Sequence, residues 1–235
     1  MTDHIAEDLK RLEERLGFSF QTKELLLQAL THRSYLNENR NHPVSHNERL
    51  EYLGDAVLEL VITEELYNKY PNKPEGELTS IRAAVVNTGS ISRAADEIGL
   101  GDFLLLSKGE AKDLGRARGY ILANTFESVV GALYLDQGYD AAKKFIDQML
   151  FDKIKEVVAT SGWYDSKSLF QEKSQEHIGI TPTYKTTDEN GPDHAKRFTV
   201  GVYLGKELVV TGEGYSKQEA EQEAAARALA LKGWK

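Results

Sequence analysis

The most constraining part of this sequence is His46–Glu64, HNERLEYLGDAVLELVITE, whose apolar spacing predicts one long helix. At about 100° per residue, Glu48, Glu51 and Asp55 fall within about 60° of one another on one side of that helix. Leucine and valine side chains occupy the opposite side and can be buried. Three carboxylates on one face repel each other unless a cation lies among them. The stretch therefore predicts either a solvated acidic face or a cation site.

Two details of the stretch favour the cation site. Gly54 lies in the middle of the predicted helix, although glycine destabilises helices. Its presence suggests that another backbone approaches there. A hard divalent ion such as Mg²⁺ takes oxygen ligands and would offset the repulsion between the acids. Asn47 or His46 is placed to cap the start of the helix. For three acids alone, the solvated face would remain the simpler interpretation.

A second helix, Tyr120–Asp136, is apolar nearly all round and is expected to be buried. Asn124 and Glu127 share one face of it, and an unpaired buried carboxylate is costly. If this face meets the acidic face of the first helix, oxygen ligands from two helices form one cluster, as in many helical metal sites. The alternative is a buried Glu127 paired with an arginine such as Arg82.

Composition limits the function in several ways. The chain has 235 residues, 40% of them hydrophobic, which supports packed cores rather than disorder. It has no cysteine, which excludes disulfides and suits a cytoplasmic location. The charged N-terminus predicts no signal peptide, and no apolar run predicts a membrane span. The net charge of −8 argues against a nucleic-acid partner unless the positive charge is concentrated locally.

The pattern along the chain predicts a multi-domain protein with two parts. Residues 1–160 read as an all-α domain, with turns at Gly17, Asn37–Pro43 and Tyr70–Pro74. Residues 165–235 read as an α+β domain in the order helix, strand, strand, strand, helix (α-β-β-β-α). The predicted elements of this second part are Ser166–Ile178, Pro182–Glu189, Lys196–Tyr203, Glu207–Glu213 and Ser216–Lys232.

The stretch HNERLEYLGDAVLEL resembles the signature segment of the bacterial ribonuclease III family, endonucleases that cut double-stranded RNA. The resemblance implies an endonuclease domain in which Asp55, Glu127, Glu48 and Glu51 are catalytic. It also implies Mg²⁺ as cofactor, with Mn²⁺ as a substitute, held by Glu48, Asp55, Asn124 and Glu127. In that family the signature helix lines a homodimer interface, which implies that Tyr52 packs against a partner subunit.

Asn124 departs from the family pattern, which usually has an aspartate at this position. Asparagine still offers a carbonyl oxygen but brings no negative charge. Three explanations remain open from the sequence: natural variation that keeps activity, natural loss of activity, or a deliberate substitution. Because all four carboxylates remain, an active enzyme with weakened metal binding is favoured.

The segments TPTYK, GPDHAKRFTV and GEGYSKQEAEQEAAARAL resemble a double-stranded RNA-binding domain. Such a domain recognises the shape, 2′-hydroxyls and phosphates of A-form RNA over about 16 base pairs. The resemblance implies that Gln171 and Glu172 meet one minor groove and that the Gly191–His194 loop, with His194, enters the next. Lys217, at the start of the last helix, would lie over phosphates. Gln171 and Glu172 could also be ordinary surface residues.

Two other groups of residues are weaker candidates. His32 and Arg33 resemble a family segment beneath the active site, although a structurally hydrogen-bonded His32 is the better interpretation. The charged stretch 107–119 offers positive charges that could meet a phosphate backbone or simply be solvated: Lys108, Lys112, Arg116 and Arg118.

The sequence therefore leads to three functional hypotheses. The first is a Mg²⁺-dependent endoribonuclease acting on double-stranded RNA, with ribosomal RNA precursors and structured messenger RNA as the substrates that the resemblance implies. The second is a catalytically silent double-stranded RNA-binding protein that lost cleavage through Asn124. The third is a helical protein whose acids only stabilise its structure.

Overall fold

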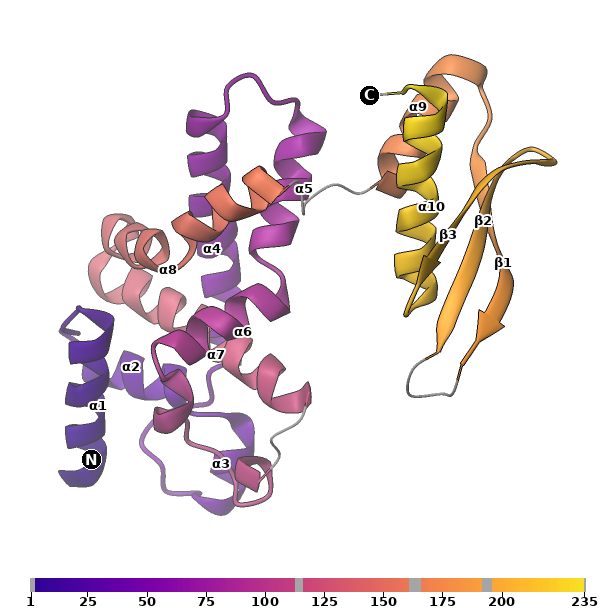
Figure 1. The fold of residues 1–235 in the computed structure, drawn as a ribbon. Coiled ribbons are helices and arrows are strands. Elements are labelled where there is room, and N and C mark those ends of the chain that lie inside the picture. Colours follow the sequence, from indigo (N-terminus) through magenta and orange to yellow (C-terminus); the bar gives the residue numbers. More distant parts are fainter. Residues whose placement is uncertain (1–2, 113–115, 161–165, 192–195, 235) are drawn as a thin grey trace. The chain divides into compact units, whose positions relative to one another are not determined.

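The computed structural model describes residues 3–112, 116–160, 166–191 and 196–234. The chain divides into two compact units, Met1–Trp163 and Tyr164–Lys235 (Figure 1). The regular elements described in the N-terminal unit are helices, apart from one isolated bridge between Thr31 and Leu105. Its elements are α1 (Asp3–Leu16), α2 (Lys23–Leu30), α3 (Arg33–Glu38), α4 (Glu48–Lys69), α5 (Glu75–Val85), α6 (Thr88–Glu97), α7 (Arg116–Gln137), α8 (Tyr139–Thr160) and the short 3₁₀ helices η1 (Leu100–Phe103) and η2 (Glu110–Lys112).

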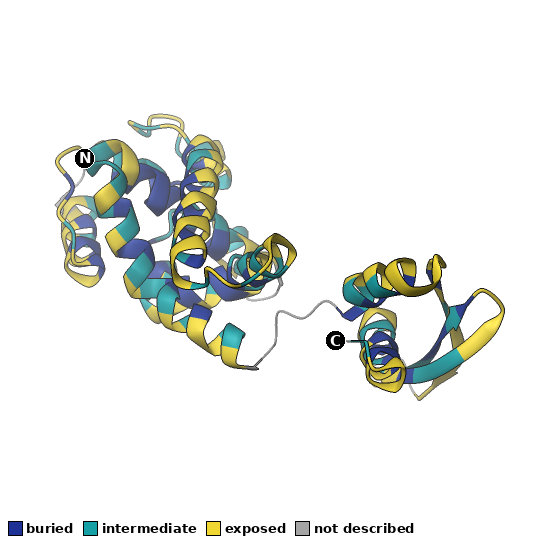
Figure 2. Cartoon of the chain, turned by 90° about the horizontal axis from the view of Figure 1, so that it is seen from above, coloured by how far each residue is buried: buried dark blue, intermediate teal, exposed yellow. Residues whose placement is uncertain are grey.

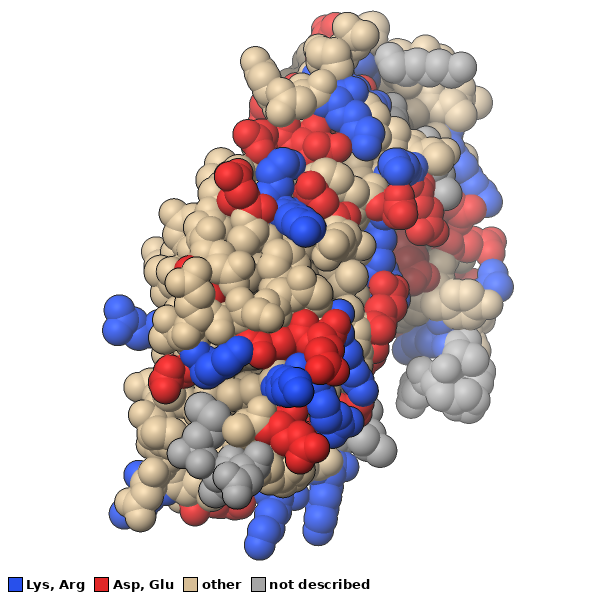
Figure 3. Space-filling view, turned by 90° about the vertical axis from the view of Figure 1, so that its left-hand side faces the viewer, with Lys and Arg blue, Asp and Glu red and all other residues tan. Residues whose placement is uncertain are grey.

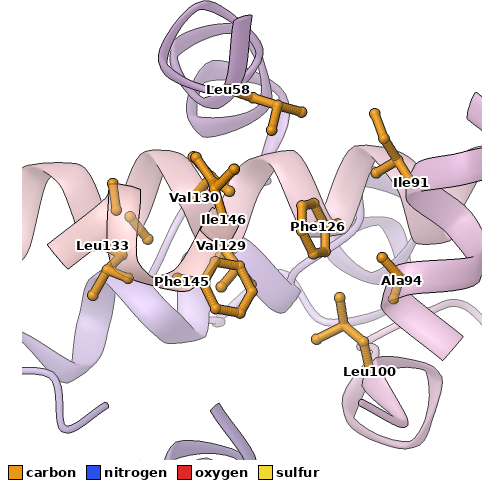
Figure 4. Packing of buried hydrophobic residues seen from close by; sticks show 14 of the residues in the cluster. Leu58, Ile91, Ala94, Leu100, Phe126, Val129, Val130, Leu133, Phe145 and Ile146 are labelled. Carbon is orange, nitrogen blue, oxygen red and sulfur yellow. The ribbon is translucent and has the colours of Figure 1, made fainter. Parts of the chain in front are cut away.

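Helix α7 is the centre of the N-terminal unit. Its apolar side chains Phe126, Val130 and Leu133 are buried against neighbouring helices, and Figure 4 shows them beside residues of α4, α6 and α8. The rings of Phe126 and Phe145 lie 5.2 Å apart between centroids. Exposed positions line the outer sides of the helices, while buried positions face this core (Figure 2). The surroundings of α7 explain why the sequence pattern is apolar on nearly every side of this helix.

Helices α4 and α7 cross with their backbones in direct contact. A Cβ atom added to Gly54 would overlap the carbonyl oxygen of Glu127 and would lie 2.9 Å from the amide nitrogen of Gly131. A Cβ atom added to Gly131 would overlap the carbonyl oxygen of Leu50. Both positions must therefore be glycine for the helices to come this close. The expectation that another backbone approaches Gly54 is confirmed, and Gly131 is its counterpart on α7.

The start of α4 is fixed by Asn47, in a different way from the predicted cap. Asn47 occupies the N-cap position, but its side-chain amide donates to the carbonyl of Ala29 at 3.2 Å instead of capping the helix. Its backbone N–H donates to the carbonyl of Thr31, and its own carbonyl accepts the hydroxyl of Ser128. The residue is buried, so these bonds satisfy polar groups that water cannot reach. The acid-bearing end of α4 is thereby tied to α2 and α7.

Side-chain hydrogen bonds fix two short helices, and one helix boundary differs from the sequence prediction. Residues 33–38 form α3, which His32 caps by accepting a hydrogen bond from the N–H of Ser34. Helix α7 begins at Arg116, four residues earlier than predicted. Helix α2 begins after Thr22, where the carboxylate of Asp136 accepts the N–H groups of Gln21 and Thr22, both at 2.8 Å.

The C-terminal unit is a three-stranded antiparallel sheet with two helices. Its elements are α9 (Ser166–Ile178), β1 (Pro182–Asn190), β2 (Arg197–Leu204), β3 (Glu207–Gly214) and α10 (Lys217–Lys232), and the strand order is β1-β2-β3. Phe170 of α9, Val202 of β2 and three alanines of α10 (Ala224, Ala225 and Ala228) form its core. Gly212 lets α10 approach β3, since a Cβ atom there would overlap the backbone of α10.

The predicted fold class is confirmed: an all-helical unit precedes a helix–strand–strand–strand–helix unit. Within the described residues, none of the helices is both long and apolar enough to cross a bilayer.

The glycine crossing makes a direct prediction about stability. Gly54→Ala should lower the free energy of unfolding by at least about 2–3 kcal/mol, because the added methyl group must push the two helices apart. Urea denaturation followed by circular dichroism measures this change. Gly119→Ala is the matched control within α7, where an added Cβ meets no described atom within 4 Å. That control should be neutral or stabilising by less than about 1 kcal/mol, and an equal loss in both variants would contradict the explanation.

Candidate active site

The crossing of α4 and α7 brings the predicted acids together. Glu48, Glu51 and Asp55 lie on the first two turns of α4, and Glu127 lies on α7 beside Gly54. Asp55 and Glu51 both act electrostatically on Glu127, and Glu48 and Asp55 both act on Glu51. We call these four residues the carboxylate cluster. The structure therefore joins the two helix faces that sequence analysis expected to meet.

The carboxylate cluster is electrostatically strained. Burial, together with the negative charges of Asp55 and Glu51, raises the pKa of Glu127 to about 7. Burial also raises the pKa of Glu51, and the charges of Glu48 and Asp55 raise it further. Neutral Glu127 avoids placing another negative charge beside the acids of α4. A cation bound in the cluster would have the opposite effect and hold all four groups in their charged forms.

Asn124 takes part in the same cluster from one turn before Glu127. Its side chain forms a hydrogen bond with the carboxylate of Glu51, which lowers the pKa of Glu51 against the larger upward effect of burial. The amide N–H₂ is the donor in this bond, since a carboxylate accepts, and the carbonyl oxygen of Asn124 remains available as a ligand. Arg82, the suggested alternative partner of Glu127, instead donates to the hydroxyl of Thr63 at 2.8 Å.

Two side chains, those of Arg33 and His46, lie next to Glu48, a contact that the sequence did not predict. A guanidinium nitrogen of Arg33 lies 3.5 Å from one carboxylate oxygen of Glu48, and Nδ1 of His46 lies 3.7 Å from the other. The only signal in the sequence was the family-like segment containing Arg33 and the position of His46 before the helix. Glu48 is thus partly compensated, while Glu51 and Glu127 face other acids.

His32 has a structural role, as preferred from the sequence. Its Nδ1 lies 2.8 Å from the hydroxyl of Ser34 and accepts the Ser34 N–H. Burial lowers the pKa of His32, against an upward effect of Glu110. The hydroxyl of Ser34 also accepts the N–H of Ser107 at 3.1 Å. The segment that begins at residue 107 is thereby attached to α3, next to Arg33.

The donor chemistry of the cluster fits a hard divalent cation. It offers four carboxylates and one amide oxygen, the ligands preferred by Mg²⁺ and Mn²⁺. Among the described residues, no three His, Cys, Asp or Glu side chains are already arranged to hold a metal ion.

The surface beside the cluster is open rather than enclosed. A pocket of about 650 Å³ is lined by His46, Glu48 and Tyr52, and the Tyr52 side chain is 83% exposed. Another groove, of about 700 Å³, lies between the end of α4 and α5 and contains none of the cluster's acids. The carboxylates with raised pKa values lie in the cluster and not in this groove, which makes the cluster the candidate site.

The predicted RNA-contacting residues occupy exposed positions where the structure describes them. Gln171 and Glu172 are exposed on α9, and Lys217 opens α10. His194 lies outside the described residues. Lys108 and Lys112 are exposed, whereas Arg118 packs next to Gly101 and the side chain of Arg116 is not described. The face in Figure 3 shows basic side chains interspersed with acidic ones around a neutral area, rather than gathered into one basic patch.

The raised pKa of Glu127 predicts how stability depends on pH in the absence of metal. Between about pH 4.5 and 7 the folded state binds more protons than the unfolded state, so stability falls as pH rises through this interval. Glu127→Gln should remove the contribution of Glu127 to this dependence and stabilise the protein at pH 8 by about 1–2 kcal/mol. Converting the whole pKa shift at about 1.4 kcal/mol per unit would give a larger value. The expected gain is smaller because solvent screens the charges around a partly exposed side chain.

Thermal or urea unfolding in EDTA at pH 5 and pH 8 measures this effect. The matched control is Glu7→Gln on α1, which removes an exposed acid outside the cluster and should leave the pH dependence unchanged. A Glu127→Gln protein that loses stability equally at both pH values would contradict the assigned cause.

Comparison with known proteins assigns the chain to a family. Residues 22–154 match the family model described as "Ribonuclease-III-like", and residues 166–232 match the double-stranded RNA binding motif. The chain is 46% identical over 219 residues to "Ribonuclease 3" of Desulforamulus reducens, covering 93% of this chain and 89% of that protein. It is 47% identical over 218 residues to "Ribonuclease 3" of Enterococcus faecalis, covering 93% and 94%.

A solved structure agrees with these matches. The nuclease domain of ribonuclease III from Campylobacter jejuni is 39% identical, with a TM-score of 0.54, and the match covers 60% of this chain and 97% of that one. The description of that structure names a region involved in dimer formation. With both units accounted for by family models and relatives matched over nearly their full length, this chain belongs to the ribonuclease III family.

Proposed function

We propose that this chain hydrolyses phosphodiester bonds in double-stranded RNA with Mg²⁺ as its cofactor and the carboxylate cluster as its catalytic site. The chain is an endoribonuclease by family, and its C-terminal unit matches the double-stranded RNA binding motif. The observation that carries the proposal for the site is the close crossing of α4 and α7, which gathers four acids and perturbs two of them. Ribosomal RNA precursors and structured messenger RNA are the proposed substrates, and a cytoplasmic location suits both them and the absence of cysteine.

In this proposal Glu48, Asp55, Glu127 and the Asn124 carbonyl would hold one or two ions, with Glu51 beside them. The chemistry that bound Mg²⁺ supplies is a more acidic water and stabilisation of the leaving oxygen. The Asn124 amide holds the Glu51 carboxylate in place by its hydrogen bond. Arg33 and His46 limit where the Glu48 carboxylate can lie, because they adjoin its two oxygens.

We also propose that the chain works as a homodimer through the N-terminal unit. Tyr52 supports this, because an aromatic side chain that is 83% exposed on the acid-bearing helix is a typical interface residue. The dimer-forming region named for the Campylobacter jejuni nuclease domain supports it as well. Two-fold symmetry would supply two cleavage sites for the two strands of one duplex.

The catalytically silent alternative is not favoured. It would require that replacing one carboxylate by an amide removes cleavage while the other four acids and their arrangement persist. Asn124 keeps a contact within the cluster, and the relatives named "Ribonuclease 3" match nearly the whole chain. The third hypothesis, acids that only stabilise structure, conflicts with the upward pKa shifts, since these acids destabilise the metal-free protein at neutral pH.

Cleavage of a long RNA duplex tests the proposal. The protein should cut the duplex with Mg²⁺, should not cut it in EDTA, and should leave single-stranded RNA largely intact. Asp55→Asn and Glu127→Gln should each lower the cleavage rate by at least about 100-fold, since each removes a charge from the cluster. Glu7→Gln is the control and should cleave normally. A duplex that is bound without being cut would support the silent alternative.

Asn124→Asp gives a separate prediction about the metal. An added carboxylate beside Glu51 and Glu127 should lower the Mg²⁺ concentration needed for half-maximal cleavage by about tenfold, because it strengthens the attraction for a divalent cation. In EDTA the same variant should be less stable than the unmodified protein at pH 8, because the added charge increases repulsion. Titration with Mg²⁺ and thermal unfolding measure the two effects, and an unchanged half-saturation would exclude Asn124 from the metal site.

A further inference from the structure

One acidic side chain in the C-terminal unit binds two lysines at once. The carboxylate of Glu189, near the end of β1, has Lys217 at 2.9 Å from Oε1 and Lys196 at 3.2 Å from Oε2. Lys217 opens α10, and Lys196 directly precedes β2. Three segments that are separate in the sequence therefore meet at this carboxylate.

A phenylalanine aligns the two lysines. Phe198 pairs with Glu189 across the β1–β2 ladder. The ammonium groups of Lys217 and Lys196 lie 5.5 Å and 5.9 Å from the centre of its ring. Cation–π contacts of this kind hold ammonium groups near the face of an aromatic ring. The lysines are therefore positioned by two features, the carboxylate and the ring.

The two lysines are arranged as in a phosphate-binding site, and the carboxylate of Glu189 takes the place of the phosphate. Two ammonium groups each contact one oxygen of the same anion, as they would contact two oxygens of a phosphate. The start of α10 adds favourable polarity for an anion. The contacts of Lys217 and Lys196 also lower the pKa of Glu189, so the carboxylate is charged at neutral pH.

We propose that Lys196 and Lys217 form one phosphate-binding site for double-stranded RNA, and that Glu189 occupies this site when RNA is absent. The proposal rests on the proposed function, because it requires that the C-terminal unit binds duplex RNA. It adds Lys196 to the RNA contacts expected from the sequence, and it gives Glu189 the role of an intramolecular competitor. An RNA phosphate must displace Glu189 before the two lysines can contact it.

The size of the effect follows from exposure. Glu189, Lys196 and Lys217 all keep solvent contact, with 34%, 36% and 57% of their side-chain surfaces exposed. Exposed ion pairs are individually weak, so competition by Glu189 lowers affinity modestly rather than blocking binding. Glu189→Gln keeps the shape of the side chain and removes its charge. We expect it to tighten RNA binding about three- to tenfold.

The salt dependence provides an independent signature. When Glu189 no longer neutralises the lysines, they attract counterions that a bound phosphate must release. The plot of log affinity against log salt should therefore become steeper by about one unit in Glu189→Gln. A thermal-unfolding measurement on the same variant should show equal or slightly lower stability, because ion pairs are lost. Tighter binding with no gain in stability separates competition from a structural effect.

The experiment uses the full chain with a fluorescently labelled 25-base-pair RNA duplex in EDTA, which prevents cleavage, and measures anisotropy at several salt concentrations. The matched control is Glu207→Gln, which makes the same change in net charge on an exposed side chain. Glu207 begins β3, at the end of the sheet away from Glu189. Lys196→Gln should weaken binding. Adding Lys217→Gln to Glu189→Gln should abolish most of the gain.

Each outcome decides the proposal. Tighter binding and a steeper salt slope for Glu189→Gln, but not for Glu207→Gln, would support it. Equal gains in both variants would mean that only net charge matters, and weaker binding in Glu189→Gln would mean that Glu189 positions the lysines for RNA; either result would overturn it. If the unmodified chain failed to bind the duplex, the proposed function itself would fail.

Discussion

The contact between Gly54 and the backbone of α7 is the constraint on which the candidate site depends. The carbonyl oxygen that excludes a side chain at Gly54 belongs to Glu127, one of the four acids in the cluster. The same contact that closes the core therefore sets the separation between the acids of α4 and the acid of α7. Gly131 repeats this relation against Leu50, one turn before Gly54 on α4. Core packing and site geometry are one feature in this unit.

The electrostatics of the cluster follow from that packing. Burial and like charges raise the pKa of Glu127 and Glu51, whereas Arg33 and Asn124 compensate only some of the neighbouring oxygens. Folding thus holds these acids together at a cost to stability, and perturbed pKa values of this kind are common at functional sites. The C-terminal unit shows the reverse arrangement, in which Glu189 already satisfies two lysines.

Much of the fold and part of the site could be predicted from the sequence because the signals were local. Helical spacing placed Glu48, Glu51 and Asp55 on one face, and a glycine inside an apolar pattern indicated a close helix contact at Gly54. The cap of α2 by Asp136 could not be predicted, since it joins residues more than a hundred positions apart. Arg33 beside Glu48 and Lys196 beside Glu189 were missed for the same reason: charged surface residues have many partners that the sequence allows equally well.

The near-neutral pKa of Glu127 couples the cluster to the proton concentration of its surroundings. Around pH 7, this side chain carries a proton for a large part of the time in the metal-free protein. If a divalent cation binds the cluster as proposed, it must displace that proton, because protonated carboxyls are poor ligands. Its apparent affinity would then fall by up to about tenfold for each pH unit of acidification below 7. The helix crossing at Gly54 would in that case link cation uptake to proton release.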